Sequence, residues 1–237
     1  MSTKSSFPPT DCRSCAIHHE CVLGQLGEGD RTILRPHLRQ RIFHRGDVLV
    51  EEGKNATVVR ILKLGTVLAH HRGLDGHSRP IGVMSRGNAF GIFAMFDRPN
   101  QVSGIALTTV RVCEIPVAAL RELSACGSQL LVQVIHAVVG NFASMAAWSE
   151  AMRIQGVVNQ LAYVVILLAD ASRSEIVELP NQSVLADLLG TRRESVARAL
   201  RTLDGEGGIH RIERKRCEVH RGKLLVRLTQ ARPESSK

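Results

Sequence analysis

The chain has 237 residues, 44% of them hydrophobic, which is enough for one large domain or two smaller ones with real apolar cores. Aromatic residues make up only 3%, which excludes a core built on aromatic packing and leaves it to Leu, Val, Ile and Ala. The formal net charge of +9 favours a polyanionic partner, either nucleic acid or an anionic membrane surface. Residues 181–237 hold 13 basic against 7 acidic residues, so most of the excess lies in the last quarter.

The first eleven residues, MSTKSSFPPTD, have neither the apolar core nor the cleavage site of a secretory signal, so a cytoplasmic protein is expected. Six cysteines in a reducing compartment favour metal or redox chemistry over structural disulfides. Residues 12–21, CRSCAIHHEC, concentrate Cys12, Cys15, Cys21, His18 and His19. Taken alone, this stretch is compatible with a metal site, a disulfide or chance, and three cysteines with one histidine are a known zinc ligand set.

A short helix is predicted over residues 23–36, and the pattern then changes. Between residues 38 and 116, short runs rich in Val, Ile and Leu alternate with glycine-containing turns, as in HRGDVLVEEGK and SGIALTTVRVCEIP. This spacing predicts an all-β barrel or jelly roll.

The next segment, residues 123–149, has no Asp, Glu, Lys or Arg. Glutamine, histidine, asparagine, serine and glycine interrupt it, so a transmembrane helix is not expected. Apolar residues follow a 4-3 spacing that predicts the seam of a long helix in a two-fold dimer, although the core helix of a single domain gives a similar pattern. The predicted interface residues are Leu131, Ile135, Val138, Phe142, Met145 and Met152.

Residues 183–209 predict a helix-turn-helix. Ser183 is expected to cap the first helix, and Gly190 with Thr191 to form the turn. The second helix is expected to enter the major groove of double-stranded DNA, because its N-terminal side chains can meet base edges. The predicted DNA-contacting residues are Arg192, Arg193, Glu194, Ser195 and Arg198. The alternative is a solvated helix end with a surface ion pair between Glu194 and Arg198.

The basic tail, IHRIERKRCEVHRGKLLVRL, is predicted to form a two-stranded wing. Basic side chains near its turns suit phosphate contacts, which position a protein on DNA without reading its sequence. These residues are Arg214, Lys215, Arg216, Arg221 and Lys223.

The order of these parts, together with HRGDVLVEEGK, VVRILKLGTV and LGTRRESVARAL, resembles the CRP/FNR superfamily of transcription regulators. The resemblance implies an α+β chain with a cysteine segment at 1–22, a cyclic-nucleotide-binding-like jelly-roll barrel at 23–122, a dimerisation helix at 123–152 and a winged helix-turn-helix at 153–237. It also implies a homodimer that binds palindromic DNA and works with RNA polymerase, not an enzyme.

Within that superfamily, the cysteine spacing and the sequence CEIP resemble the FNR branch, which senses oxygen. The resemblance implies that Cys12, Cys15, Cys21 and Cys113 hold a [4Fe–4S] cluster. Cys126 is the rival fourth ligand, and a structural zinc or thiol-based sensor remains the alternative reading. Cys126 and Cys217 are otherwise interpreted as ordinary thiols.

At other positions the sequence differs from both the cyclic-nucleotide branch and the FNR branch of the superfamily. In the cyclic-nucleotide branch a Gly-Glu pair and an Arg-Ser pair bind the ligand, but Ile92 follows Gly91 here and residues 101–103 are Gln-Val-Ser. Without the arginine, cAMP is not an expected effector. The pattern Arg193-Glu194 with Arg198 resembles the CRP form, so TTGAT- or TGTGA-like half-sites are both expected. Met145 falls where the FNR dimer helix carries an acidic residue, which predicts a partly dimeric cluster-free protein.

Overall fold

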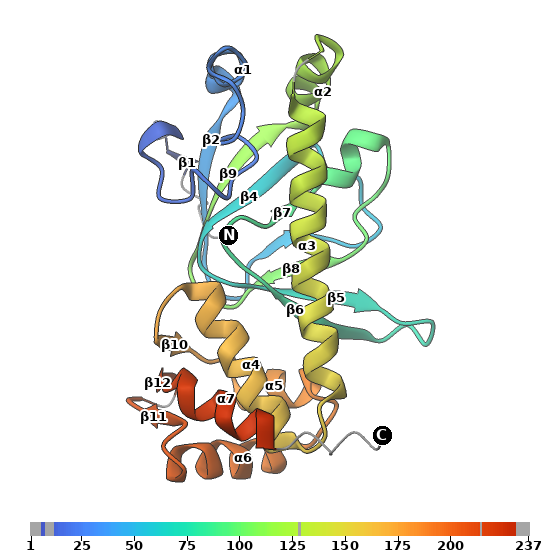
Figure 1. The fold of residues 1–237 in the computed structure, drawn as a ribbon. Helices are drawn as coiled ribbons and strands as arrows, with labels where there is room; N and C mark the ends of the chain where they lie inside the picture. Colours follow the sequence, from blue (N-terminus) through green and yellow to red (C-terminus); the bar gives the residue numbers. More distant parts are fainter. Residues whose placement is uncertain (1–5, 8–11, 128, 214, 231–237) are drawn as a thin grey trace, which may run out of the picture. The chain divides into compact units, whose positions relative to one another are not determined.

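The computed structural model of the chain describes residues 6–7, 12–127, 129–213 and 215–230 (Figure 1). The chain divides into two compact units, one formed by Met1–Ser78 with Val83–Ser144 and the other by Arg79–Gly82 with Met145–Lys237. The predicted α+β class, with an N-terminal β-sandwich and a C-terminal helix-turn-helix, is confirmed.

The sandwich consists of two antiparallel sheets. One sheet has the order β1-β2-β9-β4-β7, with bounds Ser6–Phe7, Arg39–Phe43, Val110–Pro116, Val58–Leu64 and Ala89–Phe90. The other has the order β3-β8-β5-β6, with bounds Val48–Val50, Ser103–Ala106, Val67–Arg72 and Ser78–Met84. Alternating burial along β9 and β4 explains why these Val- and Ile-rich segments form strands, since a strand directs successive side chains to opposite faces.

The segment before the sandwich, residues 12–26, is called the cysteine loop. It begins with a 3₁₀ turn, η1 (Cys12–Ser14), and continues as a series of turns. Ile17, Leu23 and Leu26 are each at most 2% exposed and belong to the core cluster of the first unit. The predicted helix over 23–36 is shorter than expected, with α1 at Glu28–Leu34 and the turn η2 at Arg35–His37. The loop is therefore anchored on the core mainly by apolar side chains.

The predicted single helix over residues 123–152 is wrong in its first turns. α2 spans Val117–Ala125, and α3 spans Leu130–Arg153. Between them Gly127 has a φ of +75°, a conformation that glycine adopts without strain and that ends a helix. A further 3₁₀ helix, η3 (Ile92–Phe96), follows β7.

The second unit holds α4 (Val157–Ser172), α5 (Gln182–Leu188) and α6 (Arg193–Gly205). A small sheet has the order β10-β12-β11, with bounds Ile176–Glu178, Arg216–Val219 and Ile209–Arg211. Gly190, with a φ of +59°, makes the turn between α5 and α6. The predicted cap at Ser183 is wrong, because the side chain of Asn181 accepts a 2.8 Å hydrogen bond from the Val184 N–H and caps α5.

The predicted wing is correct only in its first half. β11 and β12 pair as expected, but the following residues form a helix, α7 (Arg221–Gln230). The helix buries Leu224 and is held by ion pairs from Arg221 to Asp170 and from Arg227 to Glu206. Arg221 is thus a helix-end residue with a carboxylate partner, which corrects its assignment to a wing turn.

Candidate functional site

The cysteine loop and strand β9 form the first candidate site. Main-chain hydrogen bonds fold the loop, from Cys15 N–H to Cys12 O at 3.3 Å and from His18 N–H to Cys15 O at 2.9 Å. Cys21 is buried in the core cluster, and Cys12 and Cys15 pack against that cluster while half-buried. The loop thus directs its three cysteines toward the domain interior.

Cys113 lies in the middle of the five-stranded sheet, because β9 pairs with β2 on one side and β4 on the other. Its cross-strand neighbours are Gln40 and Ile61. The next residue, Glu114, faces the other way and accepts a 2.8 Å ion-pair contact from Arg60 Nε. Pairing on both sides fixes the position of the buried Cys113 thiol.

The four thiols interact electrostatically. Burial raises the pKa of Cys21 to about 11 and the pKa of Cys113 to about 12. The charges of Cys12 and Cys15 add to both shifts, and the charge of Cys21 adds to that of Cys113. The structure therefore brings Cys113 of β9 near the three loop cysteines, although about ninety residues of chain separate it from Cys21.

Two effects oppose burial and lower the pKa of these thiols, and the sequence analysis predicted neither of them. The ammonium group of Lys63 lowers the pKa of Cys113, and main-chain hydrogen bonds from Gly24 and Leu23 lower that of Cys21. Lys63 lies two residues after Ile61 on β4, where the pairing with β9 shifts register between Leu62 and Leu64.

The alternative ligands, Cys126 and His18, lie in surroundings that differ from that of Cys113. Cys126 is exposed at the C-terminal end of α2, and no effect of its charge is resolved on Cys21 or Cys113. His18 carries a buried Nδ1 without a hydrogen-bond partner in the described part of the chain. Within the described residues, no group of three or more His, Cys, Asp or Glu side chains is arranged to hold a single metal ion.

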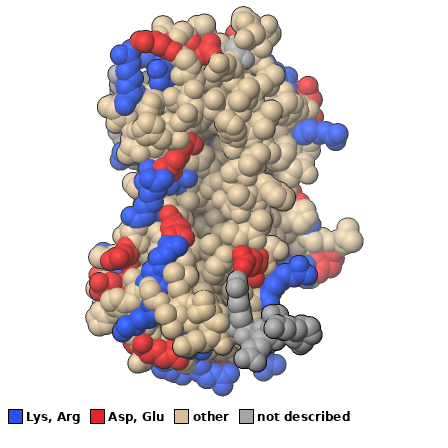
Figure 2. All heavy atoms as spheres, viewed as in Figure 1, with Lys and Arg blue, Asp and Glu red and all other residues tan. Residues whose placement is uncertain are grey.

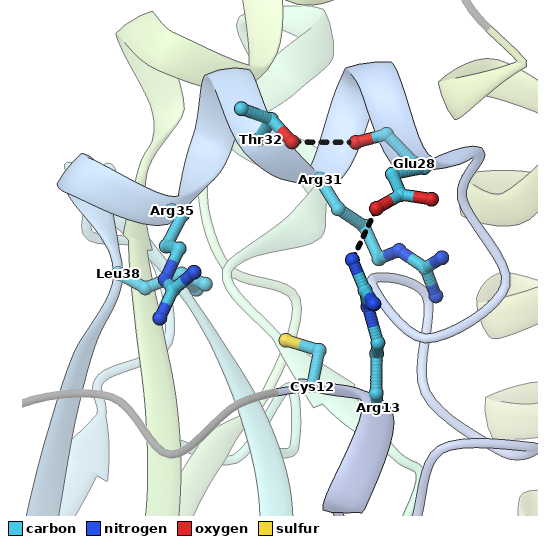
Figure 3. Close-up of a pocket in the computed structure, with 7 residues that line it drawn as sticks. All are labelled: Cys12, Arg13, Glu28, Arg31, Thr32, Arg35 and Leu38. Carbon is cyan, nitrogen blue, oxygen red and sulfur yellow. Dashed lines mark hydrogen bonds and ion pairs between the residues drawn. The ribbon is translucent and has the colours of Figure 1, made fainter.

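Cys12 also borders a small basic pocket (Figure 3). Its sulfur lies beneath α1 and η2, near Arg35 and Leu38, while Arg13 pairs with Glu28 across the pocket mouth. The outermost cysteine of the loop thus lies in a positively charged surrounding.

The position that would bind a cyclic nucleotide has other contacts here. Ile92 is buried at the start of η3, where the resemblance places an acidic ligand. Ser103 Oγ accepts a 3.0 Å hydrogen bond from the Glu52 N–H, and Gln101 Nε2 donates to Pro99 O. The expectation against cAMP stays a prediction that these contacts support.

The second candidate site is the exposed face of α6. Val196, Leu200 and Leu203 are buried on the other face of this helix. Arg192, Arg193, Glu194 and Arg198 are exposed, and Ser195 is half-buried with its Oγ 3.4 Å from Arg198 Nη2. Among the described residues Arg198 thus contacts Ser195, and not Glu194 as the alternative reading of a surface ion pair supposed.

Arg201, which sequence reasoning missed, is exposed one turn after Arg198. Among the ion pairs of the described residues, none involves an arginine of α6 or its N-cap. Blue atoms gather in Figure 2 where Figure 1 places α6. This helix therefore presents arginines that no protein carboxylate neutralises in the described structure.

The predicted phosphate-contacting residues are spread over two elements. Lys215 and Arg216 are exposed at the β11–β12 turn, where Arg216 pairs with Glu213 at 3.4 Å. Lys223 is exposed on α7, and the Asp170 carboxylate raises the pKa of Arg221. Arg214 lies outside the described residues.

α3 carries an unusual exposed surface. Of the predicted interface, Leu131, Ile135 and Phe142 are exposed, with Phe142 at 74%. Val138, Met145 and Met152 are half-buried, and Val138 also packs against the domain core, so their part in the predicted seam stays a prediction. Two exposed residues that the sequence reasoning missed are Val132 and Val139. Figure 2 shows an uncharged surface along this helix.

By length and composition alone, α3 is also long and apolar enough to cross a membrane, the one such helix among the described residues. Helices that dock on other proteins pass the same test. Asn141 of α3 exchanges hydrogen bonds with the first unit, donating to Ala89 O at 2.8 Å and accepting from Asn88 Nδ2 at 3.0 Å. A lipid-facing helix offers no such partners.

Comparison with known proteins identifies both halves of the chain. Residues 40–125 match the cyclic nucleotide-binding domain family, and residues 159–228 match the Crp-like helix-turn-helix domain family. No curated protein matches the chain in sequence.

Solved structures share the fold across most of the chain. FixK2 from Bradyrhizobium japonicum is 16% identical with a TM-score of 0.68, and the match covers 83% of this chain and 98% of that one. A CRP-family transcriptional regulator from Thermus thermophilus is 20% identical with a TM-score of 0.66, covering 82% and 99%. The c-di-GMP-responsive regulator CLP of Xanthomonas campestris is 16% identical with a TM-score of 0.63, covering 81% and 99%.

Proposed function

Because its two halves match the cyclic nucleotide-binding domain and Crp-like helix-turn-helix families, we propose that the chain is a redox-responsive DNA-binding transcription regulator of the CRP/FNR family and of the FNR type. The cysteine loop and β9 would together hold a [4Fe–4S] cluster through Cys12, Cys15, Cys21 and Cys113. The observation that supports this most is the placement of Cys113 beside the loop cysteines, whereas Cys126 is exposed at the end of α2.

The donor set fits such a group chemically. Four thiolates are the usual ligands of a [4Fe–4S] cluster. The electrostatic influence of Cys12, Cys15 and Cys21 on Cys113 supports this ligand set. When bound, the cluster supplies an oxygen-labile link between loop and strand.

The chain's own residues perform the remaining tasks. Ile17, Leu23 and Leu26 hold the loop on the core, and strand pairing holds Cys113. Lys63 places positive charge beside the thiolates, which offsets part of their mutual repulsion. The exposed apolar face of α3 would pair with a second copy of the chain, as CRP-family regulators are typically dimers.

The helix-turn-helix binds DNA, and its specificity is part of the proposal. Arg193 would make a bidentate contact to guanine, and Glu194 would accept from cytosine N4. Two copies would read a palindrome with TTGAT- or TGTGA-like half-sites, in concert with RNA polymerase. Competition between duplexes that carry either half-site distinguishes the two, and equal binding of a scrambled duplex would contradict sequence-specific reading.

The test of the sensor is metal analysis of protein purified without oxygen. We expect a brown protein with about four iron and four acid-labile sulfide per chain. Cys113→Ser is expected to lose most of both, and Cys126→Ser, the matched control, to keep them. A colourless wild-type protein, or equal loss in the two variants, contradicts the proposal.

A structural zinc site is the second candidate, because the buried His18 Nδ1 lacks a partner in the described structure. Three loop cysteines and one histidine would form that site, and Cys113 would have no part in it. The same analysis decides between the two, since stoichiometric zinc that persists in Cys113→Ser favours the zinc site.

A further inference from the structure

The turn between β6 and β7, residues 85–89, contacts the cysteine loop on one side. Arg86 Nη2 donates to Ala16 O at 2.9 Å, and Arg86 Nε lies 3.2 Å from Glu20 Oε2. Both side chains of this ion pair are about three-quarters buried, so solvent screens them less than a surface pair. Gly87 lies so close that an added Cβ would meet Glu20 Cβ at 3.3 Å.

The same turn contacts α3 on its other side. Asn88 Nδ2 donates to Asn141 Oδ1 at 3.0 Å and lies 3.4 Å from Ser144 Oγ. Asn141 Nδ2 donates to Ala89 O at 2.8 Å, and the Ala89 N–H donates back to Asn141 Oδ1 at 3.3 Å. Asn88 is only 8% exposed, so these bonds are shielded from water.

The turn between these contacts is internally braced. The Ser85 N–H donates to Asn88 Oδ1 at 2.9 Å, and the Gly87 N–H donates to Leu62 O at 2.9 Å. Arg86 and Asn88 are therefore two residues apart in one closed turn, with little freedom to move independently.

A groove opens between the loop, the turn and α3, lined by His19, Gln25, Gln133 and His136 among others. The loop and α3 also share the apolar core cluster, through Leu130 and Val134 of α3. Apolar burial is non-directional, whereas hydrogen bonds impose geometry. The polar contacts of the turn are thus suited to set the rotation of α3 relative to the loop.

We propose that Arg86 is a positioning residue that couples the conformation of the cysteine loop to α3 through the 85–89 turn. That gain or loss of a metal group moves the cysteine loop rests on the proposed function. The coupling between the loop and α3 through the 85–89 turn does not rest on it. Gain or loss of the metal group would shift the loop between two arrangements, and Arg86 and Asn88 would pass that shift to Asn141. Coupling of this kind is reciprocal, so a change on the helix side must also reach the loop.

Hydrogen exchange measured by mass spectrometry on the full-length, metal-free chain tests this coupling. Arg86→Gln is expected to accelerate exchange at least about tenfold in residues 12–21 and also in residues 138–144 of α3. Arg121→Gln is the matched control, because Arg121 also joins a carboxylate and a main-chain carbonyl, those of Asp97 and Ala94. It is expected to change neither segment.

Asn88→Ala provides the reciprocal measurement and serves if Arg86→Gln does not fold. This side chain contacts α3 and not the loop, so faster exchange in residues 12–21 is expected only if the turn couples the two. Changes confined to the segment next to each mutation overturn the coupling. Metal content of the wild type is measured separately, so absence of iron refutes the proposed sensor while the exchange data still decide the coupling.

Discussion

Truncation of Phe142 to alanine tests whether α3 is the dimer interface. Phe142 is 74% exposed in the single chain, which corresponds to about 150 Å² of side-chain surface. At ~25 cal/mol per Å², covering it completely would contribute about 4 kcal/mol per chain. In a two-fold dimer each protomer contributes one Phe142. If about half of each side chain's exposed surface is covered, the two together contribute about 4 kcal/mol. Phe142→Ala should therefore weaken the dimer by nearly three orders of magnitude.

Sedimentation equilibrium of the full chain measures the dimer dissociation constant. Leu74→Ala is the matched control, because Leu74 is a fully exposed apolar residue at the tip of the β5–β6 hairpin rather than on α3, and its loss should leave the constant unchanged. Thermal unfolding measured at concentrations where the protein is monomeric should change little in both variants, since neither side chain is in the core. A dissociation constant within about threefold of wild type for Phe142→Ala would refute the dimer assignment of this face.

Two further predictions concern the second unit. Arg193→Ala should lower the affinity for a specific duplex by roughly 10- to 150-fold and relax the preference at one base pair. Lys215→Ala should weaken binding to all duplexes alike and reduce the slope of log affinity against log salt concentration by about one. Equal behaviour of the two variants in a salt titration would contradict the assignment of α6 to base reading. Asn181→Ala should lower the free energy of unfolding by about 1 kcal/mol through loss of the α5 cap, and Ser183→Ala by clearly less. Denaturant unfolding curves give both values, and the reverse order would restore Ser183 as the cap.

The errors in the predicted elements share a cause. The segment HRGKLLVRL has apolar residues that fit either a strand or a helix. It forms α7 because Leu224 is buried and Arg221 reaches Asp170, about fifty residues earlier in the chain. Similarly, Val138 and Val139 are equivalent in sequence, and only packing makes the first face inward and leaves the second exposed.

The sequence alone was sufficient for features that depend on local chemistry. Strand and helix periods, the turn at Gly190 and the basic α6 follow from side-chain pattern and backbone preference, which act over a few residues. The spacing of the three loop cysteines is local as well. The approach of Cys113 is not, because it requires β9 to pair between β2 and β4 and the apolar residues of the loop to pack on the same core. Likewise, the contacts of Arg86 and Asn88 join segments up to seventy residues apart, and only the tertiary fold, by burying apolar surface from both, brings such polar groups within hydrogen-bond distance.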